Sequence, residues 1–189
     1  MKLRIGKIDF FIGYEAAAAM TAVLLLDREN RIVCCFLAAI LHELGHVLMM
    51  LLCGVRVRTV KLRLFDILIE ADKAPTLRAD ILITLGGVTA NFLFALLLCP
   101  FSLKMGLPHL ALGVFNILPV ISLDGGHLLS ILLAKLLSPR RVDIVLHITT
   151  FIILLPLMTA GIYMLFQSGY NYSLLLISLY LIAVLFLKK

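Results

Sequence analysis

The chain alternates long apolar runs with short polar connections, and this pattern indicates its fold class. Six runs approach or exceed the length of about 20 apolar residues that a transmembrane helix needs, namely residues 10–26, 32–53, 81–98, 107–136, 144–166 and 172–187. These runs take up most of the chain and leave no segment long enough for a second, soluble domain. The pattern therefore predicts an all-α polytopic membrane protein with six transmembrane helices in a single domain, residues 1–189.

The longest connection, residues 55–80, has a different period. From Val55 to Leu64 apolar and polar residues alternate, with a break at Thr59, and Ile67-Leu68-Ile69 is a second short apolar run. Alternation of this kind is typical of a strand. We therefore expect a small interfacial β-hairpin between the second and third helices. It is either an amphipathic element lying on the membrane or an edge that binds an extended peptide by strand addition.

Composition and charge placement agree with the membrane assignment. The 189 residues are 62% hydrophobic and 15% charged, with a mean hydropathy of +1.11. The net charge of +6 could suggest a nucleic-acid partner. However, if the N-terminus is cytoplasmic, all 17 basic residues except Arg28, Arg31 and Lys104 fall on the cytoplasmic side, as the positive-inside rule expects. We therefore predict a lipid bilayer and no nucleic acid as partner, with both termini cytoplasmic.

The second apolar run contains a polar motif, His42-Glu43-Leu44-Gly45-His46. On a helix the two histidines lie one turn apart on one face, so both can bind one metal ion, and Glu43 beside them can act on a water molecule. Each ionisable group near the bilayer midplane costs about 2.5–3.5 kcal/mol, so such groups are rarely present without a partner or a function. The alternative interpretation is a buried polar cluster that joins neighbouring helices.

The fourth run predicts a broken helix. Pro119 removes a backbone donor and Gly125-Gly126 favour unwinding, so the run should break about halfway, with Asp124 in the break and at a depth similar to that of His46. Irregular backbone at this depth is tolerated where it is buried in protein or lines a cavity. Two histidines and one aspartate leave a fourth tetrahedral position open, as catalytic zinc sites do. We therefore expect one Zn²⁺ ion per chain.

Other polar residues within the runs give weaker signals. Asn91 can form a hydrogen bond between helices. Glu15 either lies near the headgroups or faces the polar cavity, and His127 either supports the metal ligands or faces water at a helix end. His109 and His147 lie outside the cluster and are assigned no role.

Three motifs, in this order, resemble the site-2 protease family of intramembrane zinc metalloproteases. They are HELGH at residues 42–46, a G-x-x-x-N element that ends at Asn91, and NxxPxxxLDGG over residues 116–126. The resemblance covers roughly residues 8–140. Within the family the chain is most similar to the sporulation factor IVFB group, whose members have a six-helix membrane domain with an active site reached from the cytoplasm.

The resemblance implies a role for each motif residue. His42, His46 and Asp124 would bind zinc, Glu43 would be the catalytic base, and Asn91 and Asn116 would line the substrate path. No PDZ or CBS domain is predicted. The cofactor would be one zinc ion, and control would come from elsewhere, with an inhibitory membrane partner as one candidate.

The implied function is intramembrane proteolysis of a membrane-spanning or membrane-tethered protein. The subgroup likeness extends it to a precursor of a transcription factor as substrate, to sporulation, and to a bacterial cell membrane. Two alternatives from other classes stay open. One is a metal-ion transporter that uses the same ligands, and the other is a catalytically idle membrane scaffold.

Overall fold

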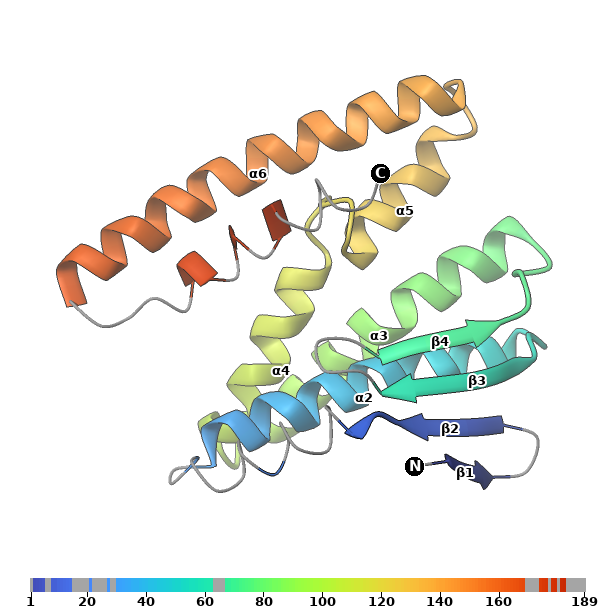
Figure 1. Ribbon diagram of the computed structural model, residues 1–189, viewed down its shortest axis with the longest axis horizontal. Coiled ribbons are helices and arrows are strands. Elements are labelled where there is room, and N and C mark those ends of the chain that lie inside the picture. Colours follow the sequence, from blue (N-terminus) through green and yellow to red (C-terminus); the bar gives the residue numbers. More distant parts are fainter. Residues whose placement is uncertain are drawn as a thin grey trace. The chain divides into compact units, whose positions relative to one another are not determined.

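A computed structural model of the chain (Figure 1) describes residues 2–5, 8–14, 21, 27, 30–62, 67–168, 174–176, 178–179 and 181–182. The chain divides into two compact units, Met1–Val114 and Phe115–Lys189, and each is described by itself. The single domain expected for residues 1–189 stays a prediction.

Two long helices form the centre of the first unit, α2 (Arg31–Leu52) and α3 (Leu77–Leu98). They approach closely because glycines face each other across the contact. A Cβ atom added to Gly45 would lie 2.5 Å from the carbonyl oxygen of Gly86, and one added to Gly86 would lie 2.7 Å from the carbonyl oxygen of Gly45. Small residues allow backbones in membrane proteins to pack this tightly. A third helix, α4 (Leu103–Asn116), follows, with its last two residues in the second unit.

Side-chain caps determine where the two long helices begin. The Asp27 carboxylate accepts hydrogen bonds from the backbone N–H groups of Arg31 (3.1 Å) and Val33 (2.9 Å) at the start of α2. At the start of α3, the Thr76 hydroxyl oxygen accepts one from the N–H of Ala79 (3.1 Å). These bonds satisfy N–H groups that have no partner within the helix.

The first unit also contains a sheet, formed by β1 (Lys2–Ile5), β2 (Ile8–Ile12), β3 (Val57–Leu62) and β4 (Ile67–Ala71). The strand order is β1-β2-β3-β4; β2 and β3 are parallel, and the other neighbours are antiparallel. The β3–β4 hairpin confirms the strands predicted between the second and third helices. Its register shifts between Val57 and Thr59, where the sequence alternation breaks.

The sheet corrects three expectations. The fold is not all-α, because strands from the N-terminus extend the predicted hairpin. The first apolar run does not begin a span at residue 10, since residues 10–12 belong to β2. The boundary is hidden because Glu15 is the one charged residue between residues 10 and 26. The expected edge near residues 55–64 is not free, because β3 pairs on both sides. Glu15 lies outside the described residues.

The second unit contains α5 (Asp124–Leu133) and the long helix α6 (Pro139–Ser168). The fourth run is broken between α4 and α5, as Pro119 and the two glycines predict. Val120 in this break is fully buried and forms a core with Leu154 and Leu181. The N–H of Ile121 donates a hydrogen bond to the hydroxyl oxygen of Thr150, at 3.0 Å. The irregular backbone is therefore held by α6.

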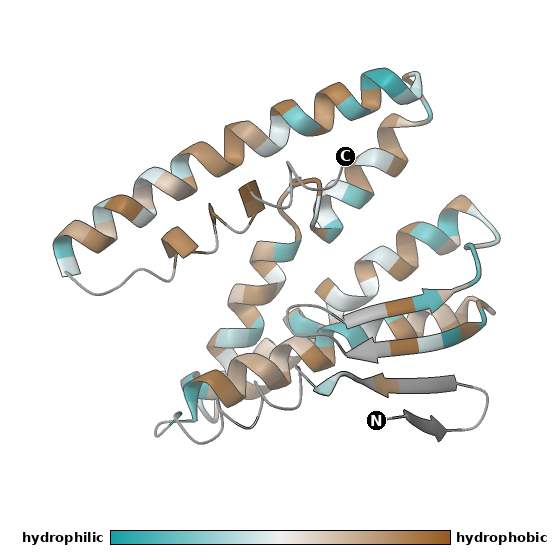
Figure 2. Cartoon of the chain, viewed as in Figure 1, coloured by the Kyte–Doolittle hydropathy of each residue, from teal (hydrophilic) through white to brown (hydrophobic). Residues whose placement is uncertain are grey.

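Three helices among the described residues are long and apolar enough to cross a membrane: α2, α3 and α6. They correspond to the second, third and fifth predicted runs, and Figure 2 shows hydrophobic residues along most of α2 and α6. Leucines such as Leu93, Leu96 and Leu97 are exposed on α3, which suits contact with lipid tails. These helices indicate a membrane protein, while six transmembrane helices stay a prediction. Much of the sixth run, residues 172–187, lies outside the described residues.

Candidate metal centre

His42 and His46 lie on the buried face of α2, together with Cys34, Ala38 and Gly45. The spacing of these residues follows the helical period, so they form one stripe along the helix. The two imidazole rings are perpendicular, at 86°, with centroids 4.8 Å apart. Their Nε2 atoms lie 3.2 Å apart. The structure thus brings the two predicted histidine ligands together as the HExxH spacing implies.

Each ring is anchored through its other nitrogen. The Nδ1–H of His46 donates a hydrogen bond to the carbonyl oxygen of Ile83, at 2.7 Å. Nδ1 of His42 lies 3.0 Å from the side-chain nitrogen of Asn91. A ring N–H that donates to a carbonyl oxygen, as that of His46 does, orients metal-binding histidines in known sites. The two contacts direct both Nε2 atoms toward the same point.

Gly87 on α3 leaves room beside these nitrogens. A Cβ atom at this position would lie 2.5 Å from Nε2 of His46 and 2.7 Å from Nε2 of His42. Any larger residue would therefore fill the space next to the ring nitrogens. Gly87 therefore leaves space for the ring nitrogens of both histidines, in addition to permitting close packing of the helices.

The spacing of the two nitrogens fits a zinc ion. Tetrahedral zinc with Zn–N distances of 2.0–2.1 Å requires its two nitrogen ligands to lie about 3.3 Å apart. The observed separation of 3.2 Å is close to this value. The histidine pair therefore needs little rearrangement to bind a metal ion.

Asp124 belongs to the second unit, where it is the first residue of α5. The two glycines after it pack against the preceding break: added Cβ atoms would collide with the backbone of Ile117 and Leu118 at Gly125, and of Val120 at Gly126. The role of Asp124 as a third ligand beside His42 and His46 stays a prediction. Two imidazoles and a carboxylate suit zinc.

The structure also gives the burial of three other residues that the sequence singled out. Glu43 is half-buried on α2, and Asn116 is half-buried at the end of α4. His127 is exposed in the first turn of α5, which favours the interpretation that it faces water. The roles of Glu43 and Asn116 stay predictions.

The sequence interpretation missed His109. This α4 residue is only 3% exposed, and its Nδ1 atom lies 3.1 Å from the amide oxygen of Asn91. Its ring also stacks on Phe94, with centroids 5.3 Å apart. An ionisable residue inside an apolar run was the available signal, because such residues are functional candidates by default.

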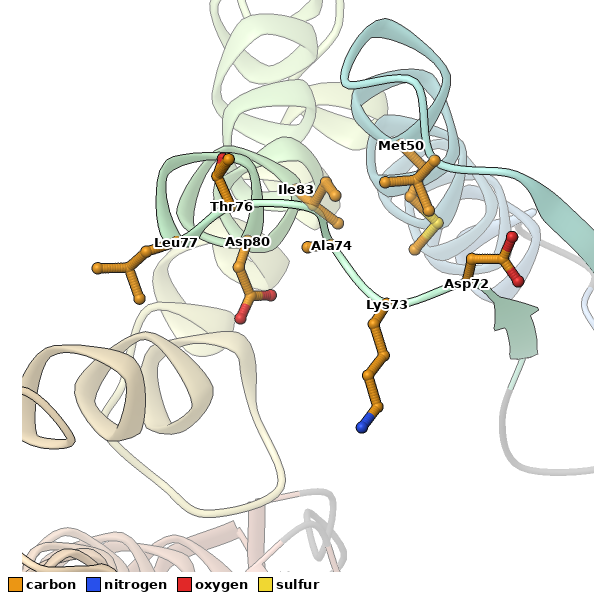
Figure 3. A pocket seen from close by; sticks show the side chains of 9 residues that line it. Met50, Asp72, Lys73, Ala74, Thr76, Leu77, Asp80 and Ile83 are labelled. Atoms are coloured by element: carbon orange, nitrogen blue, oxygen red, sulfur yellow. The ribbon is translucent and has the colours of Figure 1, made fainter.

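A pocket of about 470 Å³ lies at the ends of α2 and α3 that are nearest the sheet (Figure 3). Met50 of α2, the connection from Asp72 to Ala74 and the first turns of α3 line it. Ile83 is also part of the lining, and its carbonyl oxygen anchors His46. The pocket therefore adjoins the histidine pair through one residue of α3.

Three comparisons relate this chain to known proteins. Residues 100–156 match the model of peptidase family M50. A zinc metalloprotease of Methanocaldococcus jannaschii is 27% identical over 113 residues, which is 53% of this chain and 33% of that protein. The chain thus spans about a third of the length of this curated relative.

A solved site-2 protease from Methanocaldococcus jannaschii has the same fold, with a TM-score of 0.68 at 21% identity, over 96% of this chain and 91% of that one. The comparisons confirm the resemblance to the site-2 protease family drawn from the three motifs. Residues 100–156 are therefore similar to peptidase family M50, and the chain has the fold of a solved site-2 protease.

Proposed function

We propose that this chain is an intramembrane zinc metalloprotease in which His42, His46 and Asp124 bind one zinc ion. The observation that carries the proposal is the pair of buried Nε2 atoms, 3.2 Å apart on a helix that can cross the membrane. The space at Gly87 and the hydrogen bond from Nδ1 of His46 to the carbonyl oxygen of Ile83 support it. The family match supports a peptidase rather than a transporter. The intact set of ligand residues argues against a catalytically idle scaffold.

Zinc, when bound, supplies a Lewis acid that lowers the pKa of water and polarises a carbonyl group. Glu43 is the general base in this proposal: its carboxylate takes the proton of the attacking water and passes it to the leaving amine. Glu43 directly follows His42 on α2, and HExxH motifs place the glutamate at this position for that purpose. The buried surroundings of the histidines strengthen electrostatic interactions at the site.

The proposed substrate is a membrane-spanning or membrane-tethered protein. Its peptide bonds become accessible only when its helix unwinds, so it needs a surface that holds an extended segment. The edge strand β4 can accept such a segment by strand addition, whereas β3 cannot. β4 leads through residues 72–76 into α3, along the pocket that adjoins His46. We infer that the substrate enters along β4.

The wider proposals rest on sequence pattern and resemblance. They are a single six-helix domain, both termini in the cytoplasm, a bacterial cell membrane and an inhibitory membrane partner. The pairing of β2 with β3 supports the proposal for the N-terminus. Because both strands belong to one sheet, the N-terminal strands should lie on the same side of the membrane as the α2–α3 connection. The sporulation factor IVFB subgroup, a transcription-factor precursor as substrate and a role in sporulation rest on the resemblance alone.

The Glu43→Gln variant tests the catalytic proposal. Gln cannot accept the proton of water, so we expect cleavage to fall by about 100-fold or more while zinc binding is unchanged. Mass spectrometry of new N-termini in membrane proteins, from cells expressing either chain, would reveal fragments that only the natural chain produces. The His42→Ala variant is the control and should lose both cleavage and zinc.

Other outcomes would contradict the proposal in distinct ways. Cleavage at the normal rate by Glu43→Gln would exclude Glu43 as the base. Identical fragments, together with zinc flux into vesicles that depends on Asp124, would support the transporter. Absence of zinc binding by the natural chain would support the scaffold.

A further inference from the structure

Four side chains in the first unit form a continuous line of hydrogen bonds across α4, α3 and α2. Nδ1 of His109 lies 3.1 Å from the Asn91 amide oxygen, and the Asn91 amide nitrogen lies 3.0 Å from Nδ1 of His42. Nε2 of His42 lies 3.2 Å from Nε2 of His46, whose Nδ1 contacts the carbonyl oxygen of Ile83 at 2.7 Å. His42, Asn91 and His109 are all buried.

The hydrogen bonds along this line all run in the same direction from donor to acceptor. A carbonyl oxygen only accepts, so His46 donates from Nδ1 and offers Nε2 as an acceptor. The Asn91 nitrogen only donates, so Nδ1 of His42 accepts and His42 carries its proton on Nε2. His109 in turn donates from Nδ1 to the amide oxygen. Along these contacts each group donates toward the carbonyl oxygen of Ile83.

This direction is incompatible with zinc on His42. A metal ion needs the lone pair of Nε2, so His42 must carry its proton on Nδ1 instead. That Nδ1–H then needs an acceptor. The amide oxygen of Asn91 can accept this hydrogen bond if the side-chain amide rotates by about 180°. The amide nitrogen then faces His109, whose Nδ1 must change from donor to acceptor.

We propose that His109 is a positioning residue for the metal centre: through Asn91 it holds His42 in the form that binds zinc, and its own ring proton moves from Nδ1 to Nε2 when zinc binds. This inference rests on the proposed zinc site. Imidazole suits the position because its two nitrogens can exchange the roles of donor and acceptor while the ring stays neutral. Asn91, at 0% exposed, is thereby assigned to holding His42.

The first measurement is zinc affinity, determined on the purified full-length chain by competition with a chelating indicator. His109→Phe keeps an aromatic ring beside Phe94 but removes both nitrogens, and we expect zinc affinity to fall about 10-fold or more, as for other residues that orient metal-binding histidines. His109→Gln can both donate and accept, so it should restore affinity to within about 3-fold of the natural chain. Thermal unfolding of the metal-free variants checks that folding is retained.

The second measurement is the position of the ring proton, read from ¹⁵N chemical shifts after selective labelling of histidine. The chain has five histidines, so the spectrum is simple, and the His109 signals are those missing from His109→Phe. On zinc addition Nδ1 of His109 should change from the protonated to the unprotonated shift. The Asn91→Leu variant removes the connecting amide and should abolish this change.

The outcomes separate this inference from the zinc site itself. Zinc affinity that is the same in His42→Ala and in the natural chain would overturn both. If His42→Ala loses zinc but His109→Phe keeps full affinity, or if His109 shows no change of shift, the zinc site stands and the positioning role is wrong.

Discussion

At Gly87, α3 presents only a hydrogen atom to the two imidazoles, whose Nε2 atoms are 3.2 Å apart. The atoms that a Cβ would meet there belong to the two imidazole rings and not to backbone. Substitution at this position should therefore displace the rings more than the helices. Metal affinity and fold stability can be separated at this residue.

Gly87→Ala should weaken zinc binding by about 10–100-fold, the range seen when groups that orient metal ligands are disturbed. Stability of the metal-free chain should be retained, because alanine favours a helix over glycine by about 0.5–1 kcal/mol. Zinc competition and thermal unfolding measure the two effects. Thr89→Ala, at an exposed position of the same helix, is the matched control, and equal zinc affinity in both variants would contradict the prediction.

Residue-level prediction from the sequence succeeded where the signal was local. His42 and His46 are four positions apart on one helix, so their convergence follows from helix geometry alone. His109 could not be connected to them in this way. Its contact with Asn91 depends on how α3 and α4 pack, which the apolar pattern does not specify.

At the level of elements, the contact of α2 with α3 depends on backbone atoms. A Cβ on Gly86 would lie 2.7 Å from the carbonyl oxygen of Gly45, and this oxygen cannot turn away because it belongs to the helix backbone. The two helices can accommodate a methyl group only by separating. At Gly87, one residue further on, we expect the opposite: the imidazole rings move and the helices keep their positions.

Gly86→Ala should therefore destabilise the fold, by about 1–3 kcal/mol, as overpacking usually does. Reversible unfolding in detergent with a chemical denaturant measures this change. Gly113→Ala on α4 is the control, since its nearest neighbour would be an aromatic carbon of Phe92 at 3.3 Å, and it should cost much less. Equal loss of stability in the two variants would show that close helix contact at Gly86 is not the cause.

The sheet shows how far element prediction from sequence could go. Alternation over residues 55–64 predicted the β3–β4 hairpin and the place of its irregularity at Thr59. β2 was missed because the predicted apolar run continues from residue 10 to residue 26 with Glu15 as its one charged residue, so it was interpreted as a single span. Its partner β3 lies about 50 residues further along, and parallel pairing over such a distance leaves no periodic signal in the sequence.

At the scale of the whole molecule, the two ends of α3 should lie on opposite sides of the membrane. Lys73 precedes this helix and Lys104 follows it, and both are exposed. An N-terminal tag should be accessible from the Lys73 side, because β2 and β3 are neighbours in one sheet. Labelling of Lys73→Cys and Lys104→Cys by an impermeant maleimide, in a chain whose four natural cysteines are replaced, tests this arrangement.

The tag and Lys73→Cys should react from the same side of sealed vesicles, and Lys104→Cys from the other. A tag that reacts from the Lys104 side would contradict the membrane arrangement inferred from the sheet. The unlabelled chain without cysteines serves as the background.

The parallel pairing of β2 with β3 also constrains the order of events during synthesis. Phe11 is paired with Lys61, and ribosomes add about 5–20 residues per second, so β2 waits roughly 3–10 s for its partner. Over that time α2 must enter the membrane while β2 stays behind as an unpaired strand edge. A nascent chain in this state is open to wrong pairing with other strands, so insertion of α2 and protection of the N-terminal hairpin have to be coordinated.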